Sequence, residues 1–302
     1  MKVLICDPIA PSAVEHMHKS GIEVDVRDTI TADELLQVVP AYDALVVRSR
    51  TKVRRSVIEA ANNLKVIVRG GVGLDNIDVD CARARGIRVL NTPAASTASV
   101  AELTLAYIFA LARPVVQATL SMRAGAWEKR AFEGIEVQGK TLGIIGTGRI
   151  GTVVAMRAAA LGMIVVGYNR RTIGPAPYMA MVSLDELLAR SDFISLHVPL
   201  TESTRHMINA ETIAKMKDGV RIINCARGGV IDEDALYEAI VAGKVAGAAL
   251  DVFEEEPPAN RKLLELPQVI GSPHIGASTH EAAARVGDEV ARILIALQQE
   301  GR

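Results

Sequence analysis

The sequence has little of three features that would each indicate a particular class of protein. Only three of its 302 residues are cysteine, and because Cys6, Cys81 and Cys225 stand far apart, they favour neither a disulfide framework nor a thiolate metal site. Lysine and arginine number 34 against 35 aspartate and glutamate, so no excess of positive charge indicates a nucleic acid or an anionic membrane as partner. The chain also lacks a signal-peptide start and any run of about 18 apolar residues. We expect a cytoplasmic protein without a metal, a nucleic-acid partner or a membrane span.

What the chain has is an alternation of short apolar runs and amphipathic stretches, over a length typical of two domains. This pattern predicts an α/β protein in which helices cover both faces of doubly wound parallel sheets. Two series of strands are separated by a turn at 91–93 and one long helix at 97–123, and a last helix runs from an N-cap at Ser278 to about Gln299. The strands are predicted at 3–6, 22–26, 44–47, 66–69, 88–90, 142–145, 163–168, 193–196, 220–224, 245–250 and 269–270.

A glycine turn stands between a predicted strand and a predicted helix at 146–151. In this context Gly146 permits the tight turn, Gly148 lets backbone approach a pyrophosphate, and Gly151 allows the helix and the strand to pack closely. The phosphate charge would lie at the helix N-terminus. The pattern predicts a dinucleotide-binding domain, and the alternative is a purely structural turn. The motif residues assigned to the cofactor are Gly146, Gly148, Arg149, Ile150 and Gly151.

The second strand of this series ends without an acid. An NAD-binding domain carries Asp or Glu about 20 residues after the glycine turn, where it accepts hydrogen bonds from the ribose hydroxyls. Here the strand ends in Asn169, Arg170 and Arg171. The carboxylate that would repel a 2′-phosphate is missing, and two guanidinium groups can bind one. We therefore predict NADP in preference to NAD; the alternative is that both arginines lie in solvent and the pocket takes NAD.

Three polar residues follow strands of the second series, at the sheet edge where open α/β sheets place ligands. Arg227 suits the carboxylate and carbonyl oxygen of a 2-oxo acid. His274 suits an acid/base that works near neutral pH, and a carboxylate such as Glu256 beside it would orient the ring and favour its charged form. Each residue alone has a structural explanation, as a salt bridge, a structural histidine or a solvated acid. Together with the dinucleotide turn they predict an oxidoreductase for 2-hydroxy acids.

Several motifs in a fixed order span nearly the whole chain. They are V-R-G-G-V-G-L-D-N at 68–76, G-T-G-R-I-G at 146–151, H-V-P-L at 197–200, A-R-G-G at 226–229, L-D-V-F at 250–253 followed by E-P at 256–257, and P-H-I-G-A at 273–277. With them the chain resembles the D-isomer-specific 2-hydroxyacid dehydrogenases, and most closely the phosphoglycerate dehydrogenases.

The resemblance implies roles for single residues. Arg227 binds substrate, Glu256 supports His274, and His274 is the acid/base. Asp251 holds the nicotinamide carboxamide; the alternative is that Asp251 is a helix-cap or loop acid. The remaining cofactor contacts that the resemblance implies are His197, Pro199 and Cys225.

The resemblance also implies a discontinuous domain layout. A flavodoxin-like substrate domain comprises 1–93 and 282–302, a Rossmann cofactor domain comprises 94–281, and the active site lies in a cleft between them. Members of the family are commonly dimers joined through the cofactor domain, so the apolar helix 97–123 predicts a homodimer. The backbone loop that the resemblance assigns to the substrate carboxylate is Gly70, Gly71 and Val72.

The segment Arg48-Ser49-Arg50 follows the predicted strand 44–47 and resembles the phosphate-binding stretch of phosphoglycerate dehydrogenases. Two guanidinium groups at the end of a strand suit a phosphate dianion. The segment predicts the D-3-phosphoglycerate/3-phosphohydroxypyruvate pair as substrate, and hence a place in serine biosynthesis. The alternative for the segment is a solvated basic turn.

Two other functions remain open from the sequence. The arginines at 170–171 resemble those of NADPH-dependent glyoxylate/hydroxypyruvate reductases. A corepressor-like protein that binds dinucleotide without turnover would retain much of the same site. Because the sequence stops at 302, the regulatory extension of many phosphoglycerate dehydrogenases is not expected, nor is feedback by serine through it.

Overall fold

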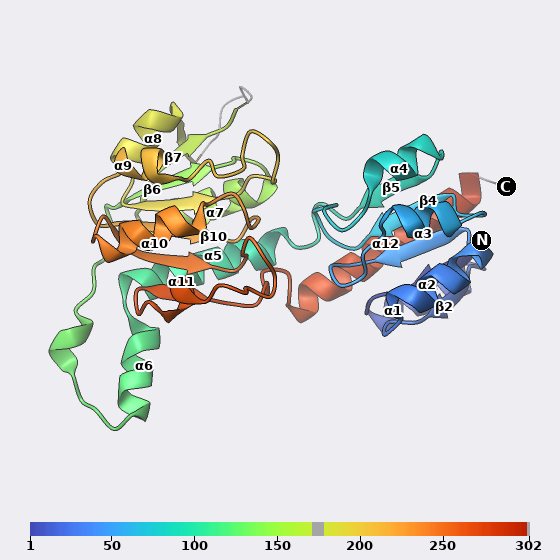
Figure 1. Ribbon diagram of the computed structural model, residues 1–302, viewed down its shortest axis with the longest axis horizontal. Coiled ribbons are helices and arrows are strands. Elements are labelled where there is room, and N and C mark those ends of the chain that lie inside the picture. The colour runs from blue at the N-terminus through green and yellow to red at the C-terminus, as the bar shows by residue number, and fades with distance from the viewer. Residues whose placement is uncertain (171–177, 301–302) are drawn as a thin grey trace. The chain divides into compact units, whose positions relative to one another are not determined.

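The structure is a computed structural model that describes residues 1–170 and 178–300 (Figure 1). Arg171, one of the residues assigned to the cofactor, lies outside the described residues. The chain divides into two compact units. Unit 1 comprises Met1–Ser96 and Ala277–Arg302, and unit 2 comprises Thr97–Gly276. These limits differ by a few residues from the expected ones at 93/94 and 281/282.

Unit 1 is built on a five-stranded parallel sheet. Its strands are β1 (Lys2–Ile5), β2 (Glu23–Val26), β3 (Ala44–Val47), β4 (Val66–Arg69) and β5 (Arg88–Asn91). Their order in the sheet is β2-β1-β3-β4-β5. Neighbouring side chains of a strand point to opposite faces, and Leu45 and Val46 accordingly belong to two different apolar cores. Because both faces are covered, the central strands are continuous apolar runs.

Helices supply the second layer on each face of this sheet (Figure 1). They are α1 (Pro11–Lys19), α2 (Ala32–Val38), η1 (Val39–Ala41), α3 (Arg55–Ala60), α4 (Val79–Ala84) and α12 (His280–Glu300). Met17 of α1 and Val290 of α12 pack in the same core as Val46. The predicted N-cap of α12 at Ser278 was wrong, because Oγ1 of Thr279 accepts the hydrogen bond from the Ala282 N–H at 3.1 Å.

Unit 2 is built on a seven-stranded parallel sheet. Its strands are β6 (Thr141–Ile145), β7 (Ile164–Tyr168), β8 (Ala180–Met181), β9 (Phe193–Leu196), β10 (Val220–Asn224), β11 (Val245–Leu250) and β12 (Val269–Gly271). Their order is β12-β11-β10-β9-β6-β7-β8. The predicted α/β class with two parallel sheets is confirmed; the short edge strand β8 was not foreseen, because two residues carry no readable pattern.

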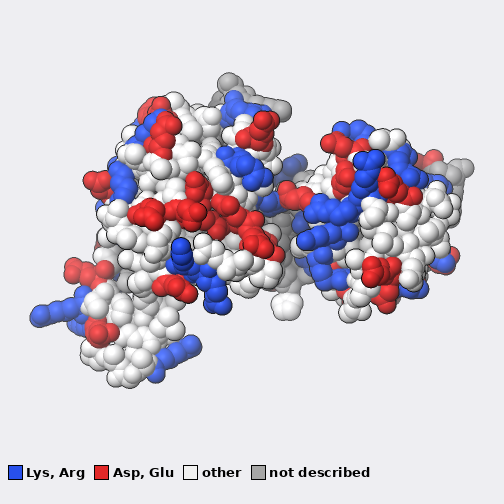
Figure 2. Space-filling model, viewed as in Figure 1, with Lys and Arg blue, Asp and Glu red and all other residues white. Residues whose placement is uncertain are grey.

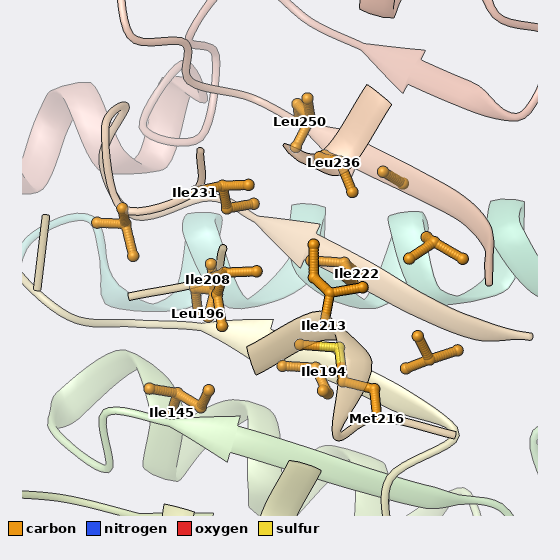
Figure 3. Close-up of a cluster of buried hydrophobic side chains, with 14 of the residues drawn as sticks. Ile145, Ile194, Leu196, Ile208, Ile213, Met216, Ile222, Ile231, Leu236 and Leu250 are labelled. Atoms are coloured by element: carbon orange, nitrogen blue, oxygen red, sulfur yellow. The ribbon is translucent and has the colours of Figure 1, made fainter. Parts of the chain in front are cut away.

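Two apolar cores enclose the sheet of unit 2. In one, Ile222 of β10 packs with Ile213 of α9 and Leu236 of α10 (Figure 3). The other lies under α5 and α7, which contribute Ile108 and Val154. These helices are α5 (Thr97–Ala112), α7 (Arg149–Ala160), α8 (Leu184–Arg190), α9 (Ala210–Ala214), α10 (Glu233–Val241) and α11 (Lys262–Glu265).

The prediction of one long helix at 97–123 was wrong, because this segment forms two helices. Helix α5 ends at Ala112, α6 (Val115–Arg123) follows, and the pair is bent by 66°. Pro114 stands at the break, where it lacks an N–H and its ring excludes a continuous helix. A short 3₁₀ turn, η2 (Lys129–Phe132), follows. Within 1–170 and 178–300 no single helix is long and apolar enough to cross a membrane; α5 and α6 pass that test only as this bent pair.

Candidate active site

The glycine turn lies at the carboxyl end of β6, whose neighbours in the sheet are β7 and β9. The winding of the sheet reverses there, which is where open α/β sheets bind ligands. Gly146 has φ 98, and a Cβ on it would lie 2.5 Å from the carbonyl oxygen of His197. A Cβ on Gly151 would lie 2.2 Å from the carbonyl oxygen of Gly146, whereas one on Gly148 would meet nothing within 4 Å. The first two positions need glycine for packing, and the third leaves open space at the start of α7.

His197, directly beside Gly146, contributes an unpaired polar atom to this edge. Its Nε2 lies 2.9 Å from Oγ of Ser195, whereas its Nδ1 is buried and has no hydrogen-bond partner among the described residues. Burial lowers the pKa of His197 to about 4, so the ring is neutral at physiological pH. A buried nitrogen without a partner and an open glycine turn both fit a dinucleotide here.

Two of the three residues after β7 that were assigned to the cofactor lie in the described part. Nδ2 of Asn169 donates to Oγ1 of Thr147 at 3.3 Å, beside the glycine turn. NH1 of Arg170 donates to Oγ of Ser203 at 2.6 Å, and its side chain is exposed. The end of β7 therefore carries an amide that contacts the glycine turn and an exposed guanidinium; their contact with a cofactor stays a prediction.

Glu256 and His274 form a direct pair. Oε2 of Glu256 lies 2.8 Å from Nδ1 of His274, and each side chain is 40% exposed. Partial burial acts to raise the pKa of Glu256, but the hydrogen bond and charge of His274, the N–H of Phe253 and the charge of Arg227 outweigh it, so the pKa is lowered from 4.5. The carboxylate is thus ionised at neutral pH and orients the imidazole.

The loop of Arg227 packs against the loop of Glu256. Asn224, the last residue of β10, shapes it by accepting from the Ala226 N–H at 3.0 Å and donating to the Arg227 carbonyl at 2.9 Å. A Cβ on Gly228 would lie 1.7 Å from the carbonyl oxygen of Phe253. Only glycine permits this close approach of the two loops. The approach also brings the guanidinium of Arg227 near enough to Glu256 for its charge to lower the pKa of that carboxyl group.

Asp251 is buried and organises the loop that carries His274. Its Oδ1 accepts from Ser272 Oγ and, at 2.7 Å, from the Ile275 N–H; its Oδ2 accepts from the Gly276 N–H at 2.8 Å. A carboxylate offers about four acceptor sites, so these three bonds leave one on Oδ2. The expected contact with the nicotinamide carboxamide stays a prediction and would use that site.

Helix α5 contributes buried hydroxyl groups that sequence reasoning missed. Ser99 Oγ donates to the Gly276 carbonyl at 2.7 Å, and Tyr107 hydrogen-bonds Ser272. Thr104 hydrogen-bonds Cys225, and burial raises the pKa of that thiol to about 12, so Cys225 stays protonated and unreactive. Hydroxyl residues in an otherwise apolar helix were the available signal.

Arg50 of unit 1 is held by protein groups. Its Nε lies 3.0 Å from Oδ1 of Asp7, which is 1% exposed. Its terminal nitrogens donate to the backbone carbonyl groups of Cys6, Asp28 and Ile30. The guanidinium that was assigned to a phosphate therefore closes the loops after β1 and β2.

Two other arginines flank the glycines assigned to the substrate carboxylate. A Cβ on Gly70 would lie 3.2 Å from Cγ of Arg48, and one on Gly71, where φ is 144, would lie 1.5 Å from NH1 of Arg69. Arg69 ends β4, and its partner in β3 directly precedes Arg48. Sequence reasoning missed Arg69, although it stands inside the 68–76 motif. Ser49 and Val72 lie at the same edge and are both exposed.

The fold, the glycine turn and the His274–Glu256 pair define a dinucleotide-dependent oxidoreductase of the α/β class. Residues 105–276 match the family model described as D-isomer specific 2-hydroxyacid dehydrogenase, NAD binding domain. The chain is 55% identical over 296 residues to a hydroxypyruvate reductase of Thermotoga maritima, covering 96% of this chain and 95% of that protein. It is 52% identical over 295 residues to a D-3-phosphoglycerate dehydrogenase of Methanocaldococcus jannaschii, covering 96% of this chain and 56% of that protein.

A solved D-lactate dehydrogenase from Aquifex aeolicus, complexed with NAD and lactic acid, is 33% identical, with a TM-score of 0.86 over 99% of this chain and 96% of that one. The chain belongs to the D-isomer-specific 2-hydroxyacid dehydrogenases, as the sequence motifs indicated. It is an oxidoreductase that acts on CH–OH donors with NAD(P). Against phosphoglycerate dehydrogenases such as the one from M. jannaschii, it spans about half of their length.

The lowered pKa of Glu256 predicts that the free energy of unfolding of the unaltered protein exceeds that of the Glu256→Gln variant by an amount that depends on pH. Because the folded pKa lies below the ordinary 4.5, the stabilisation is complete above that value and is lost as the pH falls through the folded pKa. Both side chains are 40% exposed, so the difference should be under about 1 kcal/mol. Urea unfolding of both proteins between about pH 3 and about pH 7 measures it; a difference that persists unchanged at the acid end contradicts this assignment.

Proposed function

We propose that this chain interconverts a D-2-hydroxy acid and the corresponding 2-oxo acid with His274 as the acid/base. The observation that carries the proposal is the 2.8 Å pair of His274 and Glu256, in the same unit as the glycine turn. An ionised carboxylate only accepts, so Nδ1 of His274 carries the hydrogen and Nε2 is left to exchange a proton with substrate.

Each residue of the proposed site has a distinct task. Arg227 binds the carboxylate and the carbonyl oxygen of the 2-oxo acid and polarises the carbonyl. When bound, NAD(P)H supplies the hydride that adds to the carbonyl carbon. Nε2 of His274 donates the proton that completes the hydroxyl, and in the oxidising direction the same nitrogen takes that proton up. Glu256 stabilises the charged ring through its 2.8 Å contact.

His274→Ala is expected to lower kcat by about 10² to 10⁴, the usual contribution of a positioned acid/base. His206→Ala is the matched control, because His206 also has a positive φ, is 40% exposed and lies 2.9 Å from a glutamate, Glu254; it should keep kcat within about twofold. The absorbance of the reduced cofactor follows turnover with 3-phosphoglycerate, hydroxypyruvate and glyoxylate. Full activity of the His274→Ala variant contradicts the assignment of His274 as the acid/base. If the unaltered protein turns over no 2-oxo or 2-hydroxy acid, the protein is instead a corepressor-like binding module.

We propose NADP as the preferred cofactor. Asn169 and Arg170 support this, because neither repels a 2′-phosphate and the guanidinium attracts one. Arg170→Ala should raise the KM for NADP by about tenfold while leaving that for NAD within about twofold. A kcat/KM for NAD equal to or above that for NADP in the unaltered protein contradicts the preference.

We propose D-3-phosphoglycerate/3-phosphohydroxypyruvate as the substrate pair, supported by Arg48 and Arg69 on either side of the Gly70–Gly71 backbone. Together they place two guanidinium groups at this edge of unit 1, where a phosphate dianion could be bound; the N–H groups of Gly70 and Gly71 themselves donate to the carbonyl groups of Val47 and Arg69. An NADPH-dependent glyoxylate/hydroxypyruvate reductase is the second candidate. It is favoured by the absence of a carboxylate at Asn169 and Arg170 and by the similarity to the hydroxypyruvate reductase of T. maritima, which covers 95% of that protein.

Removing Arg48 or Arg69 separates these two candidates. Arg48→Ala and Arg69→Ala should lower kcat/KM for the phosphorylated substrate by about 10-fold or more, and far less for glyoxylate. Arg50→Ala is the control, because its contacts with Asp7 and three carbonyl groups predict lower stability with no selectivity between substrates. Equal losses on both substrates in Arg48→Ala and Arg69→Ala favour the reductase.

We propose a homodimer in which a second copy covers helix α6. This helix exposes apolar side chains: Leu120 is 58% and Met122 61% exposed, and Trp127 beyond it is 82% exposed. Solitary exposed apolar residues are ordinary, but a run of them on one short segment indicates an interface. Leu120→Asp should yield monomers in size-exclusion chromatography with light scattering, and Val241→Asp, an isolated exposed residue on α10 (59%), should not. A monomeric unaltered protein contradicts the dimer.

The cytoplasmic location and the place in serine biosynthesis remain predictions. Among the described residues the three cysteines are unpaired, which is compatible with a reducing compartment. Surface charges of both signs occur on both units (Figure 2), in keeping with the net charge of −1.

A further inference from the structure

A chain of hydrogen bonds joins helix α5 to the loop that carries His274. The hydroxyl of Tyr107 bonds the hydroxyl of Ser272, and Ser272 donates to Oδ1 of Asp251. Tyr107 is 6% and Asp251 1% exposed, so both ends of the chain are buried. All three residues belong to unit 2. A buried chain of this kind restrains the groups at its ends more tightly than a solvated one.

The number of hydrogens determines the direction of these bonds. A carboxylate only accepts, so the single hydroxyl hydrogen of Ser272 points to Asp251. The oxygen of Ser272 must then accept from Tyr107. Burial raises the pKa of Tyr107 to about 12, so this donor keeps its hydrogen at any working pH. Tyr107 therefore donates to Ser272, and Ser272 donates to Asp251.

Asp251 in turn determines the backbone at His274. Besides its side-chain bonds to Ile275 and Gly276, its carbonyl oxygen accepts from the His274 N–H at 2.9 Å. His274 has φ 53, a left-handed conformation that is unfavourable for a non-glycine residue. The bonds to Asp251 hold it there, and the ring consequently meets Glu256.

We propose that Tyr107 and Ser272 are positioning residues for the acid/base of this enzyme. They act through Asp251 on the backbone of His274, and the inference rests on the proposed role of that histidine. Proton transfer needs the imidazole within hydrogen-bond reach of the substrate oxygen, so a displacement of about an ångström lowers the rate of the chemical step. Binding of the substrate through Arg227 does not pass through this chain.

The test measures kcat and KM separately, because a positioning residue should affect kcat and leave KM nearly unchanged. Tyr107→Phe removes only the hydroxyl and should lower kcat about tenfold while leaving the KM for the 2-oxo acid within about twofold. Ser272→Ala should lower kcat at least as much, because it also removes a donor from a buried carboxylate. Ser272→Thr keeps the hydroxyl and should retain most of the activity. The double variant Tyr107→Phe/Ser272→Ala should be no slower than Ser272→Ala, because both changes interrupt one chain.

Tyr42→Phe is the matched control for a merely structural effect. Tyr42 is 3% exposed, and its hydroxyl donates to a carboxylate, that of Asp25, in unit 1. Its loss should lower the melting temperature about as much as Tyr107→Phe but leave kcat unchanged. Thermal unfolding of every variant accompanies the kinetics.

The outcomes distinguish this inference from the proposed function. If His274→Ala loses activity and Tyr107→Phe keeps the kcat of the unaltered protein, the positioning role is wrong and the acid/base assignment stands. If Tyr42→Phe lowers kcat as much as Tyr107→Phe, the effect is general destabilisation and the positioning role is again wrong. If His274→Ala retains activity, the acid/base assignment fails and the inference fails with it.

Discussion

A carboxylate in a protein interior must be satisfied by hydrogen-bond donors, and the geometry of this active site depends on how Asp251 is satisfied. Its donors come from Ser272, Ile275 and Gly276, and its carbonyl oxygen accepts from His274. The hydrogen bonds to the buried Asp251 therefore determine the conformation of the segment that carries the imidazole of His274. The left-handed backbone at His274 is unfavourable alone, and these bonds offset that cost. The contact between His274 and Glu256 follows from this arrangement.

The parallel sheet of unit 2 explains why residues distant in sequence meet. Strands that run in one direction end at one edge, and the segments after β6, β9, β10 and β11 carry Gly148, His197, Arg227 and Asp251. Glycines allow these segments to touch, as Gly228 does against the carbonyl of Phe253. Chemistry is thus assembled from short loops on a rigid support, which is why one fold serves many substrates.

Arginines at the edge of unit 1 show that residue type alone does not assign a role. Arg50 is held by Asp7 and by three carbonyl groups, whereas Arg48 and Arg69 lie along the Gly70–Gly71 backbone. A guanidinium whose donors are satisfied by protein groups, as in Arg50, stabilises the loops around it.

The sequence by itself determined the α/β class, eleven of the strands to within one or two residues and the glycine turn, because apolar periodicity and turn chemistry are local properties. It also indicated Arg227, Glu256 and His274 from their chemistry and order. The apolar pattern failed to predict the break between α5 and α6, where Pro114 ends a helix that the pattern alone would continue. Only the tertiary structure decided the partners: Arg50 with Asp7, and Tyr107 with Ser272, 165 positions apart. Such contacts depend on how distant segments pack, and no short stretch of sequence encodes that.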